Sequence, residues 1–131
     1  MECQAKYDNP NVWESFTDLF DFLPIGAIIE NKFICLHAGI SPFLESKQDL
    51  LDIDRFTEIP QQGAFADLMW SDPDDKNTGF SLSPRLDNFW IRGAGFLYGE
   101  EVLKKFLHFN NLEHLLRAHQ LCMDGYQVWF K

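Results

Sequence analysis

Two short stretches decide the fold of this chain: FICLH at residues 33–37 and LLRAH at residues 115–119. Each is an apolar run that stops at a histidine, His37 or His119, and passes at once into small or polar residues. Such a run is typical of a buried strand that delivers an imidazole at the C-terminal edge of a sheet, where open α/β sheets assemble ligand sites. The alternative is a hydrogen-bonded structural role for each histidine. The pattern therefore predicts an α/β fold with a candidate site at these two rings.

The composition fits one folded domain with a substantial core. The chain has 131 residues, of which 46% are hydrophobic and 15% are aromatic. Its formal net charge is −9 and no run of Lys or Arg offsets it, which disfavours nucleic acid and anionic membranes as partners. A phosphorylated substrate is anionic too, so its binding would need a local positive centre of metal ions or arginines.

The cysteines and the absence of long apolar runs bear on the compartment. Cys3, Cys35 and Cys122 are widely spaced, which is typical of free thiols in a reducing compartment. No apolar stretch approaches the roughly 20 residues of a membrane span, and the N-terminus lacks the layout of a signal peptide. We therefore expect a cytoplasmic protein, with the nucleus as a second location.

Apolar periodicity predicts two helices. One spans residues 12–23, starting at an Asn11–Glu14 spacing that resembles a capping box, and the other opens at Glu100 with acidic residues in its first turn. The remaining expected elements are a hairpin of strands 27–30 and 33–37 around Asn31-Lys32, a short helix within 49–55, an exposed loop at 71–83 and a strand at 127–130.

Further motifs lie between the two histidines: WSDPDD at residues 70–75, SPR at 83–85 and RGAG at 92–95. Together with LHAGISP at 36–42 and RAHQ at 117–120, they resemble the catalytic core of the phosphoprotein phosphatases, the metal-dependent serine/threonine phosphatases. SPR and GAG favour the type 2A-like branch over the type 1 and calcineurin-like branches. The resemblance covers nearly the whole chain, and it implies an α/β fold: part of a metallophosphatase β-sandwich with mixed sheets flanked by helices.

The resemblance also implies a reaction and its site. Phosphoserine and phosphothreonine would be hydrolysed by a hydroxide that two divalent metal ions (Mn, Fe or Zn) activate, without a covalent intermediate. It assigns His37 and His119 to one of the two metals, and Trp70 and Asp72 to the cleft wall. His108 and His114 match no ligand position. The partners would be phosphoproteins and the scaffold or regulatory subunits of type 2A-like holoenzymes.

One motif departs from the family pattern. SPR should run directly into the glycines that begin at Gly93, yet seven residues, 86–92, intervene and end in a second arginine. Phosphate recognition needs the planar, permanently charged fork of arginine. Arg92 keeps its spacing to the glycines and is the favoured phosphate ligand, with Arg85 as the alternative. The apolar insertion is either a docking or lid element, or an irregularity of the gene prediction that disturbs the loop.

The family's bridging aspartate and catalytic acid histidine have no counterpart here, because the motifs GDxHG, GDxxDRG and GNHE do not occur in this chain. We therefore expect residues 1–131 to be the central and second-half portion of a catalytic domain, incomplete at both ends and without the C-terminal strands. No catalytic residue is assigned, and this chain would supply part of one metal site. On its own it should be inactive, because without the acid histidine no group protonates the leaving oxygen.

Two other functions remain open. The first is a non-catalytic interaction module that uses aromatic surface residues to bind phosphatase regulatory subunits. The second is a metallophosphoesterase similar to the diadenosine tetraphosphatases, which the stretch LHAGI at 36–40 also resembles. WSDP at 70–73 and RAHQ at 117–120 match the protein phosphatases better.

Overall fold

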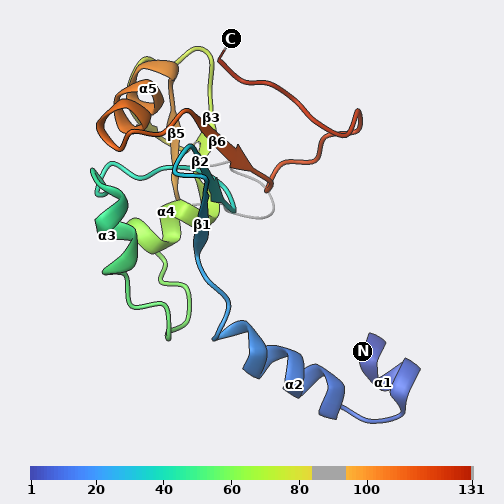
Figure 1. Ribbon diagram of the computed structural model, residues 1–131. Helices are drawn as coiled ribbons and strands as arrows, with labels where there is room; N and C mark the ends of the chain where they lie inside the picture. The colour runs from blue at the N-terminus through green and yellow to red at the C-terminus, as the bar shows by residue number, and fades with distance from the viewer. Residues whose placement is uncertain (84–93, 131) are drawn as a thin grey trace.

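The computed structural model describes residues 1–83 and 94–130 (Figure 1). The described part contains helices and short strands in this order: α1 (Glu2–Tyr7), α2 (Asn11–Phe20), β1 (Gly26–Ile29), β2 (Phe33–Leu36), α3 (Lys47–Leu51), α4 (Ala64–Trp70), β3 (Asp72–Pro73), β4 (Phe80–Leu82), β5 (Phe96–Tyr98), α5 (Glu100–Phe109) and β6 (His114–Arg117).

The described strands form two mixed sheets. In the first, the order is β1-β2-β6, with β1 antiparallel and β6 parallel to the central strand β2. In the second, the order is β3-β5-β4, with β3 parallel and β4 antiparallel to the central strand β5. Helices α3, α4 and α5 lie beside these sheets in Figure 1. The prediction of an α/β fold with mixed sheets and flanking helices is confirmed.

The hairpin forms as the sequence predicts, with its turn shifted by one residue. Glu30 and Asn31 adopt the left-handed backbone, with φ of 53° and 54°, and the Lys32 amide donates to the Ile29 carbonyl at 3.0 Å. Asparagine tolerates this conformation better than most residues. The turn therefore centres on residues 30 and 31 rather than on Asn31-Lys32.

The core joins the two sheets through α4 and α5. Its buried side chains come from β2, the segment after it, α4, β5, α5 and the segment before β6: Ile34, Leu36, Ile40, Leu44, Leu68, Tyr98, Phe106 and Leu112. Along β2 the burial alternates, as expected for a strand with one face on the core. Gly39 allows the chain after His37 to pass the Tyr98 ring, since a β-carbon there would lie 2.3 Å from Tyr98 Cε1.

The two predicted helices form, but α2 ends at Phe20 rather than at residue 23, and its capping differs from the prediction. Its N-cap is Pro10, which makes no capping hydrogen bond through its side chain, and the Asn11 amide donates instead to Asn9 Oδ1 at 3.1 Å. A capping box is found at α3, where the Ser46 hydroxyl accepts from the Asp49 amide and the Asp49 carboxylate accepts from the Ser46 amide. These contacts lower the pKa of Asp49, chiefly through the Ser46 amide.

Two other predictions from the sequence are wrong. Residues 71–83 are not a continuous exposed loop, because they contain β3 and β4, which both pair with β5. Residues 127–130 form no strand, although Phe130 packs against the core beside Tyr98, with ring centroids 6.4 Å apart.

Helices α1 and α2 stand away from the rest of the chain (Figure 1). None of the side chains of α2, all of which are described, is buried, and its apolar residues include Trp13 at 58% exposure and Phe16 at 53%. The segment after α2 contacts the rest of the chain through Arg55, which donates to the carbonyls of Asp21 and Leu23. Within 1–83 and 94–130, no helix has the length and apolar character needed to cross a membrane.

Candidate metal centre

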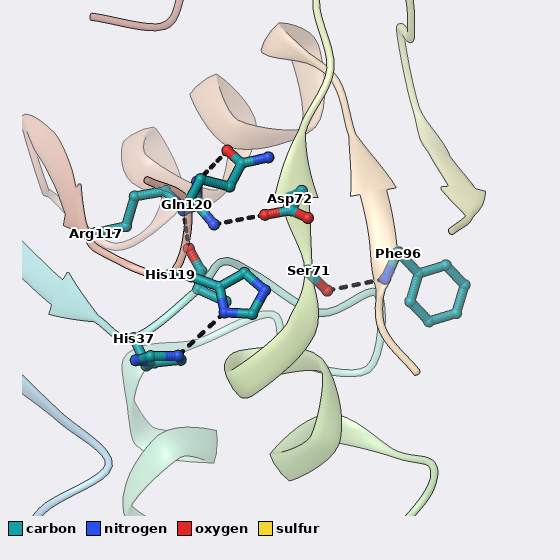
Figure 2. A network of polar contacts seen from close by, with 8 residues as sticks. His37, Ser71, Asp72, Phe96, Arg117, His119 and Gln120 are labelled. Atoms are coloured by element: carbon teal, nitrogen blue, oxygen red, sulfur yellow. Dashed lines mark hydrogen bonds and ion pairs between the residues drawn. The ribbon is translucent and has the colours of Figure 1, made fainter. Parts of the chain in front are cut away.

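The parallel pairing of β2 and β6 brings the two predicted histidines together. His37 directly follows β2, His119 follows β6 by two residues, and the Ala118 amide donates to the His37 carbonyl at 3.0 Å. Figure 2 shows the two imidazoles facing each other: His37 Nε2 lies 3.1 Å from His119 Nδ1, and the ring centroids are 5.1 Å apart at an interplanar angle of 74°. The residues are 82 positions apart in the chain, so their meeting is a product of the fold.

The distance between these nitrogens suits two kinds of contact. An N–H···N hydrogen bond between neutral imidazoles has this length. A shared metal ion also fits, because two nitrogens at about 2.0–2.1 Å from a tetrahedral ion lie roughly 3.3 Å apart. Within the described part of the chain, no group of three or more His, Cys, Asp or Glu residues is placed to hold a metal ion. The chain therefore offers a two-imidazole chelate as its candidate metal centre.

The predicted cleft-wall residues Trp70 and Asp72 contact His119 and Arg117 respectively. Trp70 ends α4, and its ring meets that of His119 edge to face, with centroids 5.5 Å apart. Asp72 begins β3 and forms an ion pair with Arg117, whose Nη2 lies 2.7 Å from Asp72 Oδ1. Trp70 therefore contacts the histidine pair directly, Asp72 contacts Arg117, and the roles of both in a cleft stay predictions.

Hydrogen bonds to β5 fix the strand that carries Asp72. The buried Ser71 hydroxyl accepts from the Phe96 amide at 3.0 Å, and the Asp74 amide donates to the Tyr98 carbonyl at 2.9 Å. Burial raises the pKa of the Tyr98 phenol, so it is neutral at physiological pH. Two features favour glycine at position 95: its φ is 80°, and a β-carbon there would lie 2.7 Å from the Trp70 carbonyl carbon.

Other predicted site residues are placed differently. Arg85, Arg92 and the insertion 86–92 lie outside the described residues. His114 is exposed at the opposite end of β6 and stacks on Phe33, and His108 lies in the last turn of α5. These positions agree with the interpretation that neither is a ligand.

Sequence reasoning missed the contacts of Arg117. Its side chain is only 11% exposed and contacts three segments: the carbonyl of Ala38 through Nε, Gln120 Oε1 through Nη1, and Asp72 through Nη2. The signal available in the sequence was a charged residue at the end of an otherwise apolar run, directly before the Ala-His pair.

Comparison with known proteins decides the family. A family model described as calcineurin-like phosphoesterase matches residues 1–123. The chain belongs to the calcineurin-like phosphoesterase family. Membership of this family implies dependence on divalent metal ions.

Relatives within the calcineurin-like phosphoesterase family point to the protein phosphatases. The chain is 51% identical over 99% of its length to a Schizosaccharomyces pombe protein named as a serine/threonine-protein phosphatase, of which it covers 40%. It is 47% identical over 98% of its length to a catalytic subunit of protein phosphatase 2A from Dictyostelium discoideum, of which it covers 39%. The chain thus spans about 40% of the length of these relatives.

A solved structure of the same kind confirms the fold. The chain superimposes with a TM-score of 0.77 and 31% identity on a protein serine/threonine phosphatase from Saccharomyces cerevisiae, which is described as similar to human phosphatase PP5. The match covers 93% of this chain and 36% of that structure. The metallophosphatase fold class expected from the sequence is confirmed.

Proposed function

We propose that residues 1–131 are the central and second-half portion of a serine/threonine phosphatase catalytic domain, which hydrolyses phosphoserine and phosphothreonine. The observation that carries this proposal is the 3.1 Å approach of His37 Nε2 to His119 Nδ1 at one sheet edge. The relatives from Schizosaccharomyces pombe and Dictyostelium discoideum support the reaction class, since both are named as protein phosphatases. Neither of these two relatives is named as a diadenosine tetraphosphatase.

His37 and His119 would hold one of the metal ions, with the remaining ligands supplied from outside this pair. When bound, divalent Mn, Fe or Zn supplies charge neutralisation at the phosphate and a nucleophile at neutral pH. Trp70 packs against the His119 ring and would help to exclude water from it. The role of this chain would therefore be to position two imidazoles and the Trp70 ring beside them.

The substrate phosphate would be bound by Arg92, with Arg85 as the alternative. A guanidinium can bind a phosphate through two parallel hydrogen bonds, which suits an acidic protein that must attract an anionic substrate locally. Arg92 directly precedes Gly93 and keeps its spacing to Gly95, whose backbone passes close to Trp70, a neighbour of the histidine pair.

Metal binding by the chain tests the site. Zn²⁺ and Mn²⁺ titrations of the 131-residue chain against a chromophoric chelator should show one site that His37→Ala or His119→Ala removes. His108→Ala and His114→Ala are matched controls that should bind as the unsubstituted chain does. Binding that survives both His37→Ala and His119→Ala would reject the chelate and leave the N–H···N hydrogen bond as the explanation of the short distance.

A chimera tests the reaction. Residues 1–131 would replace the matching part of the Dictyostelium phosphatase 2A catalytic chain, with and without the insertion 86–92, and phosphopeptide hydrolysis would be measured. We expect the chimera to hydrolyse the phosphopeptide and His119→Ala to abolish this activity. In the chimera that keeps the insertion, Arg92→Ala should reduce the activity more than Arg85→Ala does. The 131-residue chain alone, supplied with manganese, should not hydrolyse a phosphopeptide or p-nitrophenyl phosphate; turnover would contradict its predicted inactivity.

A second candidate is binding to phosphatase scaffold or regulatory subunits. The apolar face of α2 favours it, since Trp13 and Phe20 are 58% and 57% exposed. Co-precipitation of the chain with a type 2A scaffold subunit, weakened by Trp13→Ser, would support this function. Failure of the soluble chain to bind the scaffold would reject it. A cytoplasmic or nuclear location suits both candidates.

A further inference from the structure

We propose that Arg117 is a positioning residue for the histidine pair: its guanidinium ties the segments that carry His37, His119 and Trp70 into one arrangement competent for chelation. The inference rests on the proposed metal site. Arg117 acts on the imidazoles through the backbone and side chains around them. Figure 2 shows this side chain reaching across the site from the end of β6.

Each contact of Arg117 reaches a different segment. Nε donates to the carbonyl of Ala38, the residue after His37. Nη1 donates to Gln120 Oε1 at 2.7 Å, and Gln120 follows His119. Nη2 donates to Asp72 Oδ1 at 2.7 Å, on the strand that follows Trp70. One planar side chain therefore sets the relative positions of three segments that come together only in the fold.

The environment makes these contacts specific for arginine. The side chains of Arg117 and Asp72 are only 11% and 13% exposed. Water therefore has little access to the site and cannot replace the hydrogen bonds that a shorter or less branched cation would lose. Lysine carries one ammonium group and cannot donate in three fixed directions from one plane. Arg117→Lys should therefore keep the charge and the pairing with Asp72 while losing the other contacts.

The segment that carries His119 needs such support. His119 has a φ of 57°, a left-handed backbone that non-glycine residues adopt only where surrounding contacts hold it. Its neighbours are fixed on both sides, by the Ala118 amide on the His37 carbonyl and by Gln120 on Arg117. When the contact to Gln120 is lost, one support of the turn is removed, so the separation of the two ring nitrogens should vary more.

The test measures two quantities: the Zn²⁺ affinity of the chain and the contact between the rings of His37 and His119. In the 131-residue chain, Arg117→Lys and Gln120→Ala would be compared with Lys32→Met, which breaks an exposed ion pair to Glu113 at the other end of β6. Folding is checked by circular dichroism. Residues that orient metal-binding histidines typically contribute about 10- to 100-fold to metal affinity. We expect Zn²⁺ affinity to fall by this order in folded Arg117→Lys, by less in Gln120→Ala, and not at all in Lys32→Met.

The second readout is the nuclear Overhauser effect between ring protons of His37 and His119 without metal, which should weaken in the same order. A folded Arg117→Lys chain with unchanged affinity and unchanged ring contact would overturn the inference. If Arg117→Lys does not fold, Gln120→Ala decides by the same criteria. The histidines could also bind no Zn²⁺ while the contact between their rings still depends on Arg117. That result would reject the metal site and keep the positioning role, so failure of the proposed function and failure of this inference are distinguishable.

Discussion

Leu36 and Arg117 are register partners on the parallel strands β2 and β6, and this pairing determines how the two histidines meet. His37 comes one residue after Leu36, whereas His119 comes two residues after Arg117. The left-handed φ of 57° at His119 turns the chain at this offset position. Register and a local turn together therefore bring the nitrogens to 3.1 Å.

Gly39→Ala should destabilise the chain, because the segment after His37 has no room for a side chain. The added β-carbon would lie 2.3 Å from Tyr98 Cε1 and 2.7 Å from the Ser71 carbonyl oxygen. Tyr98 is 1% exposed and cannot move aside without repacking the core. Overpacking of this kind costs about 1–3 kcal/mol or more, and urea unfolding would measure it.

Gly79→Ala is the matched control, since apart from its chain neighbours no described residue has a heavy atom within 4 Å of the added β-carbon, and its φ is not in the left-handed region. Its stability should stay within about 0.5 kcal/mol of the original. Equal stabilities of the Gly39→Ala and Gly79→Ala chains would show that the Tyr98 contact is absent in solution.

Asn110→Ala should loosen the junction between α5 and α3. The Asn110 side chain accepts from the Lys47 amide at 2.6 Å and donates to the carbonyls of Glu45 and Phe106 at 3.0 and 2.8 Å. Asn110 is only 4% exposed. Alanine would therefore leave the Lys47 amide and the carbonyls of Glu45 and Phe106 without this hydrogen-bond partner where water has little access. The expected loss is about 1–3 kcal/mol of unfolding free energy.

The same unfolding experiment with Asn11→Ala provides the comparison for Asn110→Ala. Asn11 is exposed in the first turn of α2, so its truncation should change the unfolding free energy little. An Asn110→Ala chain as stable as the Asn11→Ala chain would contradict the proposed junction.

The spacing of apolar residues along the sequence predicted several of the helices and strands. Helices α2 and α5, the β1–β2 hairpin and the strand before His119 all carry a run of apolar residues long enough to identify them. The strand-end positions of His37 and His119 predicted a candidate site at a sheet edge, and the family resemblance assigned both residues to one metal ion. The α/β class and the candidate metal centre were therefore accessible without coordinates.

Short elements and side-chain networks were not accessible in this way. Strands β3 and β4 have two and three residues, and they exist because β5 pairs with both of them. Residues 71–83, with three Asp, one Asn, one Pro and one Gly, have the composition of a loop, and only pairing with the distant β5 makes parts of them strands. The contacts of Arg117 likewise join residues up to 79 positions apart, which no local pattern encodes.

The buried carboxyl of Asp67 should make stability depend on pH. Asp67 is 2% exposed and accepts a hydrogen bond from the Ser41 hydroxyl at 2.6 Å. Burial raises its pKa above the ordinary 3.8, and the Ser41 hydrogen bond opposes this rise only in part. The folded chain therefore binds a proton more tightly at Asp67 than the unfolded chain does.

The sign of the effect follows from this difference. As the pH rises from 3.8 through the folded pKa of Asp67, the unfolding free energy contributed by this group falls, because its ionised form is less favourable when buried. Asp67→Asn keeps an acceptor for Ser41 without a titrating group, so the fall should be absent from its profile. Urea unfolding at intervals from about pH 3.5 to neutral, with exposed Asp75→Asn as the control, would measure the difference between the profiles. Parallel profiles for Asp67→Asn and the original chain would show that Asp67 is solvated rather than buried beneath Ser41.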